Sequence, residues 1–81
     1  MSLFPEIHQS SSPSTPELSV VAPLFNESQN VQPLVDWILQ ALESFEAPFE
    51  IILVDDGSRD DTWEQIRSAA EDSRIVGLRL G

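Results

Sequence analysis

The sequence contains no cysteine, and His8 is its one histidine. Without cysteine, the chain cannot form a disulfide framework or a thiolate metal site. His8 lies in a polar stretch and is expected to be inert rather than a metal ligand. No apolar run approaches the ~18 residues that a membrane-spanning helix needs, and the N-terminus lacks the basic start and apolar core of a secretory signal. The expected compartment is therefore cytoplasmic.

Basic residues are also scarce, because four arginines stand against 14 acidic residues and give a formal net charge of −10. This balance argues against nucleic acid as a partner, since phosphates would be repelled without a basic patch. The acidic excess is otherwise typical of a solvated surface and assigns no function. With 81 residues, the chain forms at most one small domain of marginal stability.

The chain divides into a leader and a domain. A disordered leader is predicted for residues 1–16, because the serine- and proline-rich run over residues 9–16 has almost no apolar side chains to bury. Residues 17–81 form the expected domain. Short apolar runs in it predict three strands. The predicted strands are Leu18–Pro23, Phe49–Val54 and Ile75–Leu80.

Two helices are expected between these strands. Apolar residues recur at steps of three and four from Val31 to Phe45, which predicts one continuous buried helix face with Asn30 as its N-cap. A second helix is expected from about Asp61 to Glu71, with Asp60 or Asp61 as its cap.

The order β-α-β-α-β predicts an α/β fold with a parallel sheet and right-handed crossovers. If the strands follow one another as 3-2-1, both helices cover the same face of the sheet. The strands are nevertheless apolar on both faces, as Ile51 and Leu53 against Ile52 and Val54 illustrate. The chain therefore has the pattern of one half of a doubly wound domain. We expect the missing C-terminal half, or another subunit, to cover the bare face.

Ligands of open α/β sheets bind beyond the carboxyl ends of the strands. The loops after the first and second predicted strands, residues 23–27 and 54–58, reach that edge and bring carboxylates to it. Ionised carboxylates only accept hydrogen bonds, so they suit base N–H groups and ribose hydroxyls better than phosphate. Phe25 is placed to lie against a base, and Gly57 permits a tight turn. The run Asp-Asp-Gly-Ser is, however, equally consistent with an ordinary capped turn.

Two segments together carry a family resemblance: LSVVAPLFNE at residues 18–27 and FEIILVDDGSRDDT at residues 49–62. They resemble the opening of family-2 glycosyltransferases of the GT-A fold, and are most similar to the dolichol- or polyprenyl-phosphate branch. The resemblance covers Leu18 to Gly81 and implies a Rossmann-like nucleotide-sugar-binding domain. It implies that the base and ribose of a UDP- or GDP-sugar are held by Pro23, Phe25, Glu27, Val54 and Asp56.

The match has two departures at the residue level. Phe25 replaces the tyrosine usual at its position, which keeps the ring face and removes a hydroxyl. Asp55 is expected to support the turn rather than to contact the nucleotide.

The resemblance also implies what this chain does not carry. The complete family transfers the sugar to an acceptor, a polyprenyl phosphate in the similar branch, at the cytoplasmic face of a membrane and with Mg²⁺ or Mn²⁺. Its Asp-x-Asp metal motif, catalytic base and membrane helices have no counterpart before Gly81. We therefore expect the isolated chain to hold no catalytic residue, to bind no metal alone and to be inactive.

Two alternatives remain open at the level of sequence. The run from Ile51 to Asp56 locally fits a signalling receiver, although the last strand ends without the aspartate that a receiver phosphorylates. The chain is also consistent with a non-catalytic remnant or interaction segment that folds with a partner. A dinucleotide-binding fold does not fit, because no glycine-rich turn follows the first strand.

Overall fold

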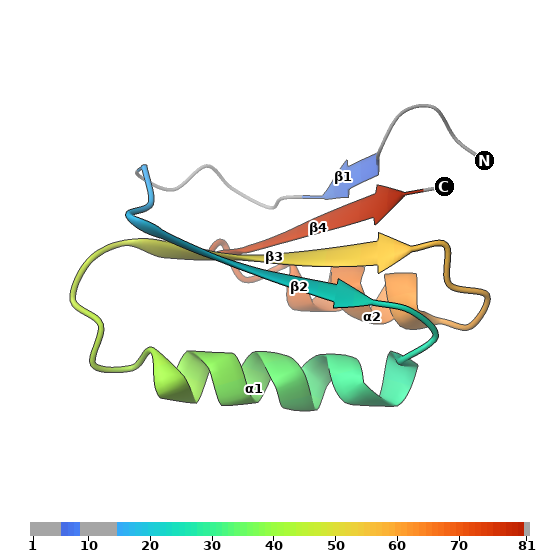
Figure 1. Cartoon of the computed structure of the whole chain (residues 1–81), viewed down its shortest axis with the longest axis horizontal. Helices are drawn as coiled ribbons and strands as arrows, with labels where there is room; N and C mark the ends of the chain where they lie inside the picture. The colour runs from blue at the N-terminus through green and yellow to red at the C-terminus, as the bar shows by residue number, and fades with distance from the viewer. Residues whose placement is uncertain (1–5, 9–14, 81) are drawn as a thin grey trace.

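The computed structural model of the chain describes residues 6–8 and 15–80 and has the predicted α/β architecture (Figure 1). All three predicted strands are confirmed, and the first two run one or two residues further than expected. The elements in chain order are β1 (Glu6–His8), β2 (Leu18–Leu24), the 3-10 helix η1 (Ser28–Asn30), α1 (Val31–Ala41), β3 (Phe49–Asp56), α2 (Thr62–Ala69) and β4 (Ile75–Leu80).

The sheet has the order β1-β4-β3-β2. β2 pairs with β3 in parallel, and β3 pairs with β4 in parallel, so the predicted 3-2-1 progression is confirmed. Figure 1 shows α1 and α2 on the same side of the sheet. This placement follows from two right-handed crossovers that step in one direction.

The structure differs from the sequence-based expectation at Glu6–His8. This segment falls within residues 1–16, for which a disordered leader is predicted, yet it forms β1 and pairs antiparallel with residues 77–79 of β4. Without β1, β4 would be an edge strand with free N–H and C=O groups, and such an edge pairs with any extended chain. Backbone pairing of this kind needs no apolar pattern. Residues 1–5 and 9–14 of the predicted leader lie outside the described residues.

The core lies between the sheet and the two helices. Ile51 and Leu53 of β3 point into it and are completely buried. Their neighbours in the core come from every third or fourth position of the helices, as the amphipathic pattern predicts. These helix residues are Val31, Val35 and Ile38 of α1 and Trp63, Ile66 and Ala69 of α2.

Both helices are shorter than the apolar pattern predicts. α1 ends at Ala41, and Phe45 lies beyond it, where its ring packs edge-on against Phe49 with centroids 6.4 Å apart. α2 spans Thr62–Ala69, within the predicted range. No helix among the described residues is long and apolar enough to cross a membrane.

The opposite face of the sheet is the bare face that the sequence predicts. Within the described part of the chain, no helix covers it (Figure 1). Val21 of β2 is 60% exposed there, and its register neighbour Ile52 is only half-buried. Ile52 in turn aligns with Val76 of β4. This apolar surface, the open face, is the one on which Pro23, Val54 and Asp56 also lie, because side chains alternate along a strand.

Candidate functional site

The loops after β2 and β3 meet at one edge of the sheet, as expected for the carboxyl ends of neighbouring parallel strands (Figure 1). The backbone amide of Asn26 donates a hydrogen bond to Ser58 Oγ at 2.8 Å. In return, Asn26 Oδ1 accepts one from the Arg59 amide at 2.8 Å. Asn26 has a positive φ of 50°. Asparagine tolerates that region better than most residues, which suits it to this sharp turn.

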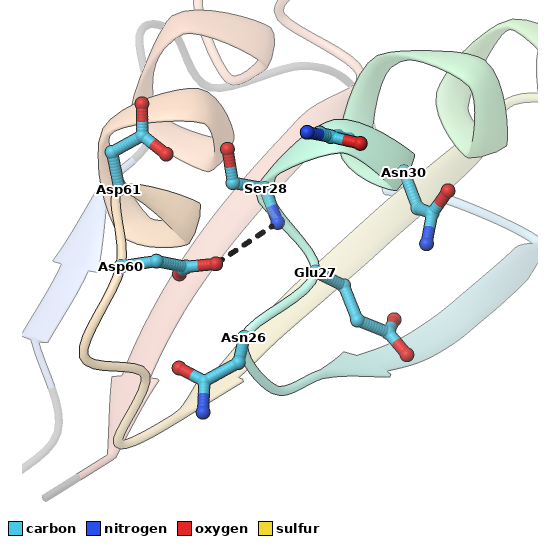
Figure 2. A pocket seen from close by; sticks show the side chains of 7 residues that line it. Asn26, Glu27, Ser28, Asn30, Asp60 and Asp61 are labelled. Carbon is cyan, nitrogen blue, oxygen red and sulfur yellow. Dashed lines mark hydrogen bonds between the residues drawn. The ribbon is translucent and has the colours of Figure 1, made fainter.

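A second set of hydrogen bonds joins the same loops nearer the helices. Thr62, the first residue of α2, is completely buried, and its Oγ1 accepts a hydrogen bond from the Glu27 amide at 2.9 Å. The Thr62 hydroxyl also donates to Asp60 Oδ1. Asp60 Oδ2 accepts from the Ser28 amide at 3.4 Å, as Figure 2 shows. We call the hydrogen bonds of Asn26, Glu27 and Ser28 with Ser58, Arg59, Asp60 and Thr62 the inter-loop latch.

Asp60 caps the start of α2. Its Oδ1 accepts from the Thr62 amide at 2.9 Å, whereas Asp61, the other predicted cap, makes no side-chain capping bond. The hydrogen bond from the Thr62 hydroxyl is the main reason that the pKa of Asp60 lies below its ordinary value of 3.8, and the amides of Thr62 and Ser28 lower it further. Asp60 is therefore ionised at neutral pH.

Asp55 supports the turn after β3, as the sequence predicts. It is completely buried, and its Oδ1 accepts from the Ser58 amide at 3.0 Å. Its Oδ2 has no hydrogen-bond partner among the described residues, and Arg79 Nε lies 4.0 Å away. Gly57, within this turn, has a φ of 81°, a conformation that favours glycine.

The residues predicted to hold the nucleotide all lie at this edge, some on the strands and some in the loop after β2. Pro23 and Val54 are register partners on the open face, and Asp56 lies one pleat further along β3 on the same face. Phe25 follows the end of β2 and is 57% exposed. Glu27 is exposed in the loop before η1. Their roles as nucleotide contacts stay a prediction.

A cavity of about 380 Å³ lies between the two loops on the side of the helices. Among the predicted nucleotide contacts, Glu27 alone lines it, and the others lie on the open face or at its rim. The lining residues are polar throughout: Asn26, Glu27, Ser28, Gln29, Asn30, Asp60 and Asp61.

The sequence alone assigned no role to Asn26, Ser58 or Thr62. Local signals pointed to two of them. Asparagine shortly after a strand is typical of a turn with positive φ, and threonine two residues after Asp60 fits the capping pattern of a helix start. That these residues bond to one another required the fold, because they come from different loops.

The acidic side chains of this cavity do not fit the divalent cation that the family resemblance implies. Both oxygens of Asp60 already accept hydrogen bonds from Ser28 and Thr62. Figure 2 shows the Glu27 carboxylate pointing away from Asp60 and Asp61. Within residues 6–8 and 15–80, no group of three or more His, Cys, Asp or Glu side chains is arranged to hold a metal ion.

The edge is therefore rich in hydrogen-bond acceptors and poor in positive charge. Glu27, Asp56, Asp60 and Asp61 surround it, and Arg59 is the basic residue of the two loops. Carboxylates that accept no hydrogen bond from the described residues, those of Glu27, Asp56 and Asp61, suit groups that donate hydrogen bonds. Such groups are found on the edge of a base and on ribose.

Comparison with known proteins assigns the chain to a family. The sequence profile described as "Glycosyl transferase family 2" matches residues 19–81. A dodecaprenyl-phosphate galacturonate synthase of Rhizobium johnstonii is 54% identical over 46 residues, which are 57% of this chain and 14% of that protein. An undecaprenyl-phosphate 4-deoxy-4-formamido-L-arabinose transferase of Aeromonas hydrophila is 40% identical over 65 residues, covering 78% of this chain and 20% of that protein. No solved structure matches the chain significantly.

The chain thus spans a fifth or less of the length of these curated relatives. The family profile, by contrast, matches all but the first part of the chain, including both loops of the candidate site. The chain belongs to glycosyl transferase family 2.

Proposed function

We propose that this chain is the nucleotide-binding portion of a family-2 glycosyltransferase. In the complete protein, a sugar would pass from a UDP- or GDP-sugar to a polyprenyl-phosphate acceptor. One observation carries the proposal: the loops after β2 and β3 meet at the carboxyl edge of a parallel sheet and leave free carboxylates there. The names of the relatives support the acceptor class, since each name refers to a polyprenyl phosphate.

The proposed contacts divide by chemistry. Phe25 offers an exposed ring face for a base. The carboxylates of Glu27 and Asp56 accept hydrogen bonds from the base edge and the ribose hydroxyls. Pro23 and Val54 border the nucleoside on the open face. The diphosphate is not assigned to any of these residues, because a carboxylate repels it.

Further parts of the proposal concern the rest of the protein. A divalent cation, Mg²⁺ or Mn²⁺, would neutralise the diphosphate when bound, and its ligands would come from residues beyond those described. The open face would be covered by the C-terminal half of the same domain or by another subunit. The acceptor class points to the cytoplasmic face of a membrane as the working place of the complete protein.

The experiment is a titration of the chain with UDP and GDP, with and without Mn²⁺, followed by isothermal calorimetry or amide chemical shifts. We expect saturable binding of one nucleotide, and loss of that binding in Asp56→Ala. Glu43→Ala is the matched control, because Glu43 is an exposed acid in the turn after α1, away from the candidate edge. The proposal would be refuted if the chain bound neither UDP nor GDP saturably. It would also be refuted if Glu43→Ala lost as much nucleotide affinity as Asp56→Ala.

A further inference from the structure

The part of the inter-loop latch nearest α2 depends on a single buried hydroxyl, that of Thr62. Thr62 Oγ1 accepts from the Glu27 amide at 2.9 Å and donates to the Asp60 carboxylate. A threonine hydroxyl has one donor hydrogen and two acceptor lone pairs, so both kinds of capacity are used here. Thr62 is polar and yet completely buried. The two partners of its hydroxyl, Glu27 and Asp60, both lie outside α2.

The latch ties the backbone of the first loop to the second. Glu27 is bound to Thr62, Ser28 to Asp60, and Asn26 to Ser58. Ser58 is in turn held by Asp55 at the end of β3, next to Asp56 in the chain. The two carboxylates proposed to meet the nucleoside are therefore carried by loops that are joined through hydrogen bonds from backbone amides to side chains, not by independent loops.

The local backbone supports this interpretation. Asn26 adopts a positive φ of 50°, which costs free energy for a residue other than glycine and persists where neighbouring bonds enforce it. Two polar groups of Asn26, its backbone amide and its side-chain Oδ1, are bonded to the second loop. The loop that carries Phe25 and Glu27 is thus held in one conformation from both sides.

We propose that Thr62 and Asp60 are positioning residues of the nucleotide site, which fix the loop of Phe25 and Glu27 against the loop of Asp56 before the ligand arrives. This inference rests on the proposed function. A site that is already ordered avoids the cost of immobilising side chains and loops on binding. Removing the latch should therefore weaken nucleotide affinity even though neither Thr62 nor Asp60 touches the nucleotide.

The experiment compares Thr62→Val with Thr62→Ser in the 81-residue chain. Valine keeps the shape of threonine and removes the hydroxyl, whereas serine keeps the hydroxyl and removes a methyl group. Two readouts are taken: the affinity for UDP and GDP, and the hydrogen exchange of the Glu27 and Ser28 amides. Amide exchange of Ile51 and Leu53 in the core reports the global stability of each variant.

In Thr62→Val we expect about tenfold weaker nucleotide binding and about tenfold faster exchange at Glu27, relative to any change in the core amides. Thr62→Ser should restore both to within about threefold. If Thr62→Val does not fold, Asp60→Asn replaces it, since Asp60 is exposed and asparagine keeps its shape. This variant should weaken binding and speed exchange at Ser28.

The outcomes separate the two proposals. A wild-type chain that binds neither nucleotide overturns the proposed function and the positioning role with it. A wild-type chain that binds, together with a Thr62→Val chain that binds equally well, overturns the positioning role alone. The positioning role also fails if Thr62→Ser does not restore affinity while its core amides exchange as in the wild type, because the loss would then come from packing rather than from the hydroxyl.

Discussion

Gly77 offers the sharpest test of how α2 packs on the sheet. It lies on the buried face of β4, directly beneath α2. A Cβ added at this position would lie 2.8 Å from Ile66 Cγ2 and 3.4 Å from two ring carbons of Trp63. Ile66 is completely buried and Trp63 nearly so, so neither side chain has free space into which to move. Alanine at position 77 should therefore force α2 away from the sheet.

The size of the effect follows from two opposing terms. Overpacking a tight core costs about 1–3 kcal/mol. Replacing glycine by alanine in a strand recovers roughly 0.5–1 kcal/mol of backbone entropy. The difference of the two ranges is about 0–2.5 kcal/mol, so the expected net loss in the free energy of unfolding for Gly77→Ala is about 1 kcal/mol. In a domain of this size, each kcal/mol lowers Tm by roughly 4–8 °C.

The assay is urea and thermal unfolding, followed by fluorescence and far-UV circular dichroism, in a double-mutant cycle with Ile66→Leu. Leucine removes the Cγ2 methyl group and keeps the side-chain volume, a change that alone should cost less than about 1.5 kcal/mol. If the clash with Cγ2 is the cause, the double variant should be more stable than the sum of the single effects predicts, by roughly 1 kcal/mol.

Gly57→Ala is the matched control. Gly57 has no atom within 4 Å of an added Cβ but has a φ of 81°, so its loss should come from backbone strain and should not couple to Ile66→Leu. The packing argument would be refuted if Gly77→Ala were stabilising, or if its effect added to that of Ile66→Leu without coupling.

Two further substitutions test local interactions by urea unfolding. Asp55→Ala removes the acceptor of the Ser58 amide and should lower the free energy of unfolding by about 1–3 kcal/mol, whereas an unchanged midpoint would mean that the turn does not depend on it. Asp72 accepts two hydrogen bonds from the Arg74 guanidinium, and these bonds are the main reason that its pKa lies below 3.8. The pKa of Asp72 is lower in the folded chain than in the unfolded one. The ionised Asp72 therefore stabilises the fold above pH 3.8, and this stabilisation is lost as the pH falls through the lower folded pKa. The wild type should therefore lose more stability than Asp72→Asn as the pH falls below 3.8, and parallel pH profiles would contradict this.

Much of the fold was predictable from the sequence because the signals were strong and local. β3 is apolar on both faces and bounded by a proline and a glycine, which is typical of a central parallel strand. The hand of the crossovers then placed both helices on one face and left the other bare. β1 could not be predicted in this way, because three residues are too few to show a period and the register with β4 is set only in the folded chain.

The C-terminal end of α1 was harder to predict than its start at Val31. The apolar spacing continues from Ile38 to Leu42 and Phe45, so the pattern shows no break. Leu42 nevertheless leaves the helix, with φ −99° and ψ 6°. Phe45 packs its ring against Phe49 instead of along a helix face, and it remains 39% exposed. An apolar spacing indicates which residues contact other apolar residues, and a turn can provide such contacts as well as a helix can.

The location of the candidate site at the carboxyl edge of the sheet was predicted from the sequence. The hydrogen bonds that join its two loops were not. Parallel pairing of β2 and β3 was enough to bring Phe25, Glu27 and Asp56 to the same edge of the sheet. The latch joins residues that are 32 to 35 positions apart, and their partners are set by the packing of two loops. The family match, which covers both loops, favours the glycosyltransferase interpretation over the receiver alternative.

The charge of the edge leads to a last prediction about which part of the ligand these loops hold. A chain with a net charge of −10 repels a diphosphate but not a neutral nucleoside. Salt screens that repulsion, with a Debye length of about 10 Å at 0.1 M. If Glu27 and Asp56 hold the base and ribose, UDP should bind more tightly as NaCl rises from about 20 to 300 mM, a range set by that screening length. Uridine should be almost insensitive to salt. The measurement is the Kd of both ligands over that range, without divalent cation. Weaker binding of UDP at high salt would instead indicate that a basic group contacts the diphosphate, with Arg59 as the first candidate. That result would refute the idea that these acidic loops hold only the base and ribose while the rest of the protein holds the diphosphate.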